Sequence, residues 1–154
     1  MPRALETRLP PPVLLGLLGI GLWWAARRWP DWTSAWSGAP WIGAAIALGG
    51  GYWNVAPKRR FRRAATTVNP MRPQSARALV TTGLHARSRN PMYVGQVLVL
   101  AGWGVGLRTG LVVPALLVQV LWLTWLQIVP EERALQARFG EAYTAYRQRV
   151  RRWL

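Results

Sequence analysis

Four long stretches of this chain contain no charged residue, and they decide what the sequence can fold into. They lie between Arg8 and Arg27, Asp31 and Lys58, Arg89 and Arg108, and Arg108 and Glu131, and they hold 18, 26, 18 and 22 residues. A helix needs about 20 mostly apolar residues to cross the hydrocarbon core of a bilayer. The pattern predicts a polytopic membrane protein, although the mean hydropathy of the whole chain is only +0.08.

We expect an all-α fold in one membrane domain, 1–154, with spans at about 11–29, 40–57, 91–107 and 110–129. The prolines at 10–12 suit the start of a helix but not its interior. A signal peptide is a poor alternative for the first span, because no small-residue cleavage site precedes Arg27 and Arg28. Only three residues, 108–110, separate the last two spans, which predicts a tight antiparallel hairpin.

The basic residues predict the orientation of these spans. The net charge is +15, with 17 basic residues on one side of the predicted membrane and three, Arg27, Arg28 and Arg108, on the other. Basic residues favour the cytoplasmic side, so both termini are expected there. This topology explains the charge better than nucleic-acid binding does. Arginine outnumbers lysine 19 to 1, which suggests a bacterial genome rich in G and C, and thus the inner membrane.

Composition also excludes several kinds of chemistry. The chain has no cysteine and a single histidine, which removes disulfides, a Cys nucleophile and any plausible metal cluster. No Gly-x-Gly-x-x-Gly follows a strand pattern, so we expect no Rossmann fold. The catalytic part is expected in a cytoplasmic loop, 58–90, and an amphipathic C-terminal helix, 130–154.

Two segments of this cytoplasmic part carry motifs that topology does not explain. After a turn at Gly83, the first reads Arg89-Asn90-Pro91-Met92-Tyr93-Val94-Gly95. The second reads Glu131-Glu132-Arg133-Ala134-Leu135, then Phe139-Gly140-Glu141-Ala142-Tyr143-Thr144-Ala145-Tyr146 and Arg149. In this order around a hydrophobic hairpin, they resemble the isoprenylcysteine carboxyl methyltransferases and phospholipid methyltransferases, integral membrane enzymes. The resemblance covers about 57–152, including Thr66–Pro70.

The resemblance implies S-adenosyl-L-methionine (SAM) as methyl donor and S-adenosyl-L-homocysteine as product, with no metal. It implies catalytic roles for Arg149, Glu132 and Tyr93. It implies a cofactor site made from the ends of the membrane helices. The residues expected at that site are Gly83, Leu84, His85, Arg89, Asn90, Pro91, Tyr93, Glu131, Glu132, Leu135, Tyr143 and Tyr146.

Each assignment has a structural alternative. Glu131 and Glu132 lie about 100° apart on a helix, so one can face the cofactor while the other orients an arginine. They would also suit the positive end of a helix dipole. Asn90 can cap the third span. Tyr93 fits an interfacial tyrosine equally well, and Tyr143 and Tyr146 fit aromatic anchors of an amphipathic helix as well as an adenine or acceptor contact.

Two residues indicate which chemical group could accept the methyl. His85 can take a proton from an amine or thiol, but a filled aromatic slot is the favoured interpretation. Arg149 matches the family position linked to the acceptor and can pair with a carboxylate. The neighbouring Arg147, Arg151 and Arg152 are assigned to lipid headgroups.

The leading hypothesis is methyl transfer to a lipid or lipidated acceptor at the cytoplasmic membrane face. An isoprenylcysteine carboxylate is favoured, with the amine of phosphatidylethanolamine and a small hydrophobic thiol as alternatives. A family member that binds SAM without turnover is a weaker option. A different class of function is a membrane adaptor whose basic segment 58–63 binds anionic lipid.

Overall fold

A computed structural model of the chain describes residues 9–63 and 78–154. Within these residues the fold is all-helical and contains no strand, only an isolated bridge between Thr33 and Thr109. The expected all-α class without a Rossmann sheet is therefore confirmed for the described part. Thr66–Pro70 and the basic residues Arg3, Arg8, Arg72 and Arg77 lie outside it.

The first two helices follow the expected spans at their starts. Helix α1, Pro11–Arg28, begins at a proline and ends at two arginines, and the Arg27 guanidinium lies 4.3 Å from the ring centre of Trp23. Helix α2, Ala39–Arg63, continues six residues beyond its predicted end because the buried Pro57 is accommodated inside it. The prediction that 58–63 are loop is therefore wrong.

The second half of the chain is a helical hairpin with a long second arm. Helix α3, Pro91–Gly106, is followed by a turn in which Arg108 adopts a φ of 62°. Helix α4, Val112–Trp122, runs without a break through the π-helical segment η5, Leu123–Ile128, into α5, Val129–Arg149. Pro130 cannot donate to the ladder, and the wider π turn precedes the point where its ring enters the helix.

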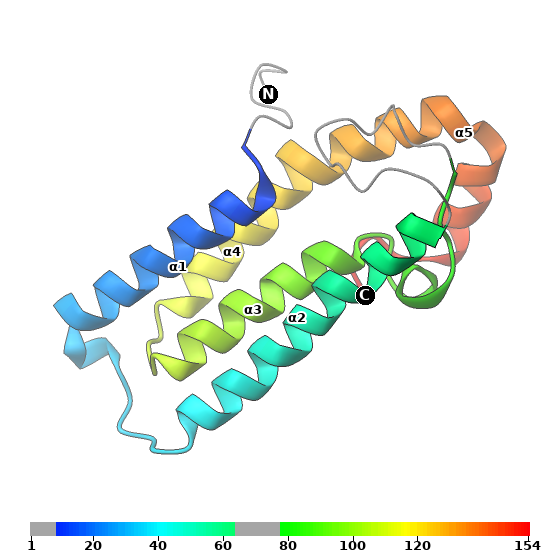
Figure 1. The fold of residues 1–154 in the computed structure, drawn as a ribbon. Helices are drawn as coiled ribbons and strands as arrows, with labels where there is room; N and C mark the ends of the chain where they lie inside the picture. The colour runs from blue at the N-terminus through cyan, green and yellow to red at the C-terminus, as the bar shows by residue number, and fades with distance from the viewer. Residues whose placement is uncertain (1–8, 64–77) are drawn as a thin grey trace.

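Glycines allow α2 and α3 to approach backbone to backbone. A Cβ on Gly50 would lie 2.7 Å from the carbonyl oxygen of Gly95, and one on Gly102 would lie 2.5 Å from that of Gly43. Small residues at such positions are how helices pack closely where lipid removes the hydrophobic drive to associate. In Figure 1, α2 and α3 lie side by side, and α1 and α4 cover the other side of α3.

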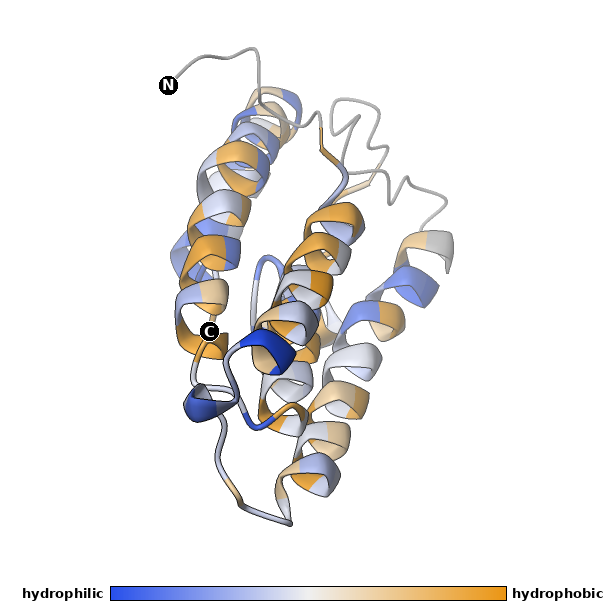
Figure 2. Cartoon of the chain, turned by 90° about the vertical axis from the view of Figure 1, so that its left-hand side faces the viewer, coloured by the Kyte–Doolittle hydropathy of each residue, from blue (hydrophilic) through white to orange (hydrophobic). Residues whose placement is uncertain are grey.

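Within residues 9–63 and 78–154, one helix is long and apolar enough to span a membrane, the continuous helix Val112–Arg149, and α3 is apolar but shorter. Helices α1 and α2 fall short of this test because arginines, prolines and glycines dilute their apolar residues. Large apolar side chains nevertheless face outward on several helices, among them Leu17, Trp41, Leu48 and Val113, each more than half exposed. Figure 2 shows hydrophobic residues distributed along the helices of the bundle.

Helix α5 bends sharply at Gly140. This residue has φ 50° and ψ −122°, a conformation that L side chains rarely adopt. Figure 1 shows the orange part of α5 continuing the line of α4 and the red part turning back toward the bundle. The bend returns Tyr143, Tyr146 and the chain end to the start of α3.

Candidate functional site

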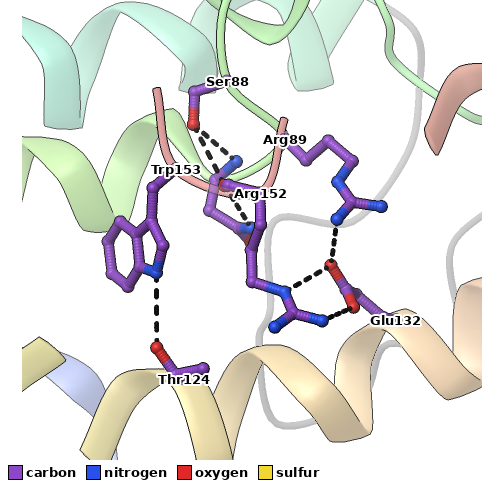
Figure 3. A network of polar contacts seen from close by, with 7 residues as sticks. Ser88, Arg89, Thr124, Glu132, Arg152 and Trp153 are labelled. Atoms are coloured by element: carbon purple, nitrogen blue, oxygen red, sulfur yellow. Dashed lines mark hydrogen bonds and ion pairs between the residues drawn. The ribbon is translucent and has the colours of Figure 1, made fainter. Parts of the chain in front are cut away.

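Three segments far apart in the sequence meet at one end of the bundle. They are the loop 88–90 that enters α3, the first turn of α5, and the C-terminal residues 151–153. Figure 3 shows their side chains pointing toward one another. Of the predicted site residues, this meeting point contains Arg89, Asn90, Glu131 and Glu132.

Glu132 lies at the centre of this arrangement. Its carboxylate accepts from Nε and Nη2 of Arg152 at 3.1 and 2.7 Å and lies 3.0 Å from Nη2 of Arg89. The side chains of Glu132 and Arg89 are only 9% and 10% exposed. The hydrogen bonds to Glu132 raise the pKa of Arg152. A buried carboxylate needs such partners, because an unpaired charge in the interior is costly.

The C-terminal segment is bound to the loop before α3 through its backbone. The carbonyl oxygen of Arg152 accepts from Asn90 Nδ2 at 2.9 Å and from Ser88 Oγ at 3.3 Å. The Arg89 amide donates to the carbonyl of Arg151, and Trp153 Nε1 donates to Thr124 Oγ1. The sequence interpretation missed Ser88 and Trp153, and its assignment of Arg152 to lipid headgroups is wrong, since the Arg152 guanidinium pairs with Glu132. Nothing in the spacing of these residues indicates that the chain end folds back.

Asn90 occupies the N-cap position of α3, but its side chain makes no capping bond. The predicted side-chain cap is therefore wrong. The amide nitrogen of the side chain is already engaged by the Arg152 carbonyl, and the Asn90 backbone amide donates to Ser88 Oγ at 3.1 Å. Pro91 is buried in the first turn of the helix, in keeping with its fixed φ.

Glu131 has different partners from Glu132. Its Oε1 accepts from the Tyr93 hydroxyl and from Gln127 Nε2, both at 2.5 Å. The Tyr93 ring is buried against Leu14 and Ile128. The adjacent glutamates thus link α5 to two places, Glu131 to the first turn of α3 and Glu132 to the loop before it.

Tyr143 and Tyr146 lie together behind this loop. Their ring centres are 6.2 Å apart, both are buried, and Leu135 packs against them. The Tyr146 hydroxyl donates to the His85 carbonyl at 2.7 Å. Burial raises the pKa of Tyr143 to about 12 and that of Tyr146 further. Both phenols are therefore protonated at neutral pH.

His85 is buried with its ring edge-on to Phe61, the two ring centres 5.1 Å apart. Burial, with a smaller contribution from the Arg60 charge, lowers its pKa to about 4. The imidazole is neutral at pH 7, and among the described residues its Nδ1 has no hydrogen-bond partner. The His85 ring packs against an aromatic ring, which is the interpretation that the sequence favours. A role of His85 as a base for the methyl acceptor stays a prediction.

Two groups of predicted residues lie away from Glu132. The Arg149 side chain is exposed and its Nε donates to the carbonyl of Ala145 at 3.3 Å. Gly83 and Leu84, in the 3-10 helix η4, Gly83–Ala86, line a separate cavity beside α2. The structure therefore groups Arg89, Asn90, Tyr93, Glu131 and Glu132 and leaves Arg149 outside.

The Arg89 guanidinium has capacity for a further ligand. Its Nη2 is paired with Glu132, but within the described part of the chain its buried Nε and Nη1 have no hydrogen-bond partner. Buried donors without partners are rare and call for an explanation. A guanidinium oriented by Glu132 suits an anionic group such as the carboxylate of SAM.

Comparison with known proteins identifies the class. Residues 39–142 match the phospholipid methyltransferase family, and the chain belongs to that family. The predicted family membership is confirmed, and the family is one of membrane methyltransferases. The matched range contains both glutamates, Arg89 and Tyr93, and it ends before Tyr143, Arg149 and Arg152.

A shorter bacterial relative covers part of the chain. An uncharacterised protein of Haemophilus influenzae is 36% identical over 63 residues, which is 41% of this chain and the whole of that relative. No solved structure matches the chain.

Proposed function

We propose that this protein transfers a methyl group from SAM to a lipid acceptor at the cytoplasmic face of a bacterial inner membrane. The observation that carries the proposal is the Arg89–Glu132 pair, inside the range matched by the family. It combines a buried carboxylate with a guanidinium that keeps two unpartnered nitrogens. Buried donors without partners are uncommon, and a bound anion would give these two nitrogens acceptors.

Each residue of the cluster has a proposed task. Bound SAM supplies the electrophilic methyl group. Arg89 would hold its carboxylate through a guanidinium N–H that Glu132 leaves free, and Glu132 fixes the Arg89 guanidinium in place. Glu131 accepts from a ribose hydroxyl or the amine while Tyr93 holds it. Tyr143 and Tyr146 support the loop that leads to Arg89. The chain mainly aligns reactants and excludes water.

The proposed topology has four spans with both termini in the cytoplasm. Its support is geometric: the α1–α2 connection and the α3–α4 turn lie together, with Ser34 N donating to the Arg108 carbonyl at 2.9 Å and Gly110 N to the Trp32 carbonyl at 3.1 Å. Arg108 lies in the α3–α4 turn, and Arg27 and Arg28 end α1 just before its connection to α2, so the three basic residues expected outside lie at this end of the bundle. Helix α1 has 18 residues, about 27 Å at 1.5 Å per residue, close to the hydrocarbon thickness.

The acceptor is proposed to be a lipid amine, as in phosphatidylethanolamine. The family description favours a phospholipid, and the exposed Arg149, on which the isoprenylcysteine carboxylate was favoured, lies outside the cluster. An isoprenylcysteine and a small hydrophobic thiol remain alternatives. An amine or a thiol must lose its proton before attack, whereas a carboxylate needs no base.

The decisive experiment incubates the purified protein with labelled SAM and total lipid from the source organism, followed by identification of the labelled product. We expect a methylated lipid from the wild type and a large loss with Glu132→Gln. The matched control, Lys58→Gln with Arg59→Gln, removes charge from the basic segment and should retain activity. The adaptor hypothesis predicts the reverse ranking. Absence of SAM binding by calorimetry in both detergent and lipid would exclude the proposal.

A further inference from the structure

The cavity lined by Gly83 and Leu84 lies beside the candidate site, between the end of α2 and η4. Its volume is about 400 Å³, and polar and apolar surfaces both line it. Helix α2 contributes aromatic and basic side chains, and the segment of η4 contributes backbone and a second arginine. The lining residues used below are Tyr52, Trp53, Arg60, Gly83 and Arg87.

Two arginines give this cavity a strong positive charge. Within the described residues, the only hydrogen bond of the Arg60 side chain is from Nη1 to Thr82 Oγ1, at 3.1 Å, and the Arg87 side chain has neither a hydrogen bond nor an ion pair. No described carboxylate lies within ion-pair distance of either. Each guanidinium therefore keeps several donors for an external anion.

We propose that Arg60 and Arg87 form a binding site for the phosphate group of an anionic lipid, separate from the Arg89–Glu132 cluster. Guanidinium groups match phosphate oxygens in geometry and charge. A lipid is the committed source because the cavity adjoins apolar surface on α2. Tyr52 in its wall is 64% exposed and the nearby Val55 is 52% exposed. A headgroup can reach the arginines while its acyl chains stay along α2.

The backbone beneath Arg60 is shaped for this contact. Gly83 has a φ of +67°, and a Cβ there would overlap the Arg60 guanidinium. The guanidinium therefore rests directly on the first residue of η4. A phosphate bridging Arg60 and Arg87 would join α2 to η4, whose other side holds the His85 carbonyl against Tyr146. The site thereby connects anionic lipid to the loop that leads to Arg89.

The test measures lipid retention and does not depend on methyl transfer. Full-length protein is reconstituted in nanodiscs of phosphatidylcholine with phosphatidylglycerol, and bound lipid is counted by native mass spectrometry after detergent release. We expect wild type to retain phosphatidylglycerol and the variant Arg60→Gln with Arg87→Gln to lose about tenfold in affinity. The matched control, Lys58→Gln with Arg59→Gln, removes equal charge from the same helix end and should retain the lipid.

Further arms separate the sources of phosphate and guard against misfolding. Inorganic phosphate and glycerol phosphate are titrated against the protein in detergent. If they bind but lipid is not retained, Arg60 and Arg87 bind phosphate, and the assignment of a lipid as its source is overturned. If the glutamine variant does not fold, the variant Arg60→Lys with Arg87→Lys takes its place. It preserves the positive charge, and we expect it to retain part of the lipid binding. Equal loss in both glutamine variants, or no retention by wild type, would overturn the site.

Discussion

Arg152 and Glu132 join the end of the chain to the start of α5, with Arg152 Nη2 2.7 Å from Glu132 Oε2 and its Nε 3.1 Å from Oε1. A two-pronged contact of this kind is shorter and stronger than one between neutral groups. It orients the carboxylate that holds Arg89, so the last residues of the chain belong to the candidate site.

Substitution Arg152→Ala is expected to lower the free energy of unfolding by about 1–2 kcal/mol and to weaken SAM binding. It leaves the buried Glu132 with one partner, although the partial exposure of Arg152 reduces the cost. Unfolding in detergent and calorimetry with SAM measure the two effects. The control is Arg151→Ala, whose side chain is exposed. An equal effect of both variants would show that only net charge matters.

Substitution Tyr93→Phe removes the hydroxyl that donates to Glu131 and leaves the ring buried. We expect a loss of about 1–3 kcal/mol of stability, because the buried Glu131 carboxyl loses one of its hydrogen-bond donors. Thermal unfolding of the detergent-solubilised protein measures it. Tyr52→Phe, at an exposed tyrosine on α2, is the control and should be neutral. No change in the Tyr93→Phe variant would mean that this hydrogen bond is unimportant.

The packing of α2 on α3 predicts opposite effects at adjacent glycines. Gly50→Ala should destabilise by about 1–3 kcal/mol, because its Cβ would lie 2.7 Å from the Gly95 carbonyl oxygen in a tightly packed interface. Gly51→Ala meets no atom within 4 Å and should be neutral or stabilising. Unfolding curves of the two variants provide the comparison. Equal behaviour would contradict the close helix contact.

The bend in α5 makes Gly140 a further test. Gly140→Ala forces a side chain into a φ of 50° with ψ −122°, which costs about 1–3 kcal/mol or straightens the helix. A straightened helix would withdraw Tyr146 from the His85 carbonyl and lower SAM affinity. Gly49→Ala, an open helical position on α2, is the control. Unchanged SAM affinity in Gly140→Ala would separate the bend from the site.

The pH dependence of stability is expected to reflect His85. Its pKa is about 4 in the folded protein, against 6.5 for an ordinary histidine. Below pH 6.5 the unfolded chain binds a proton that the folded chain does not, so stability falls as the pH drops toward 4, by up to about 3 kcal/mol. His85→Phe keeps a ring beside Phe61 and should remove this part of the slope. Parallel profiles for both proteins would contradict the assignment.

The sequence was most informative where a physical pattern repeats along the chain. The uncharged stretches located the helices, and α1 and α3 begin at the predicted residues 11 and 91. Glu131, Glu132, Arg89 and Tyr93 are all predicted site residues, and in the structure Glu132 pairs with Arg89 while Glu131 accepts from Tyr93. Prediction was weaker at helix ends, since a proline such as Pro57 breaks a helix in isolation but not when packing supports it.

By itself, the amino-acid sequence determined the all-helical class, the family and the residue types of the site, because these depend on local composition and on ordered motifs. Only the tertiary structure decided that Arg152 rather than Arg149 contacts Glu132. That choice depends on the bend at Gly140 and on backbone bonds from Ser88 and Asn90 to the Arg152 carbonyl. Such contacts join residues more than sixty positions apart, and no local pattern can indicate which of several arginines they bring inward.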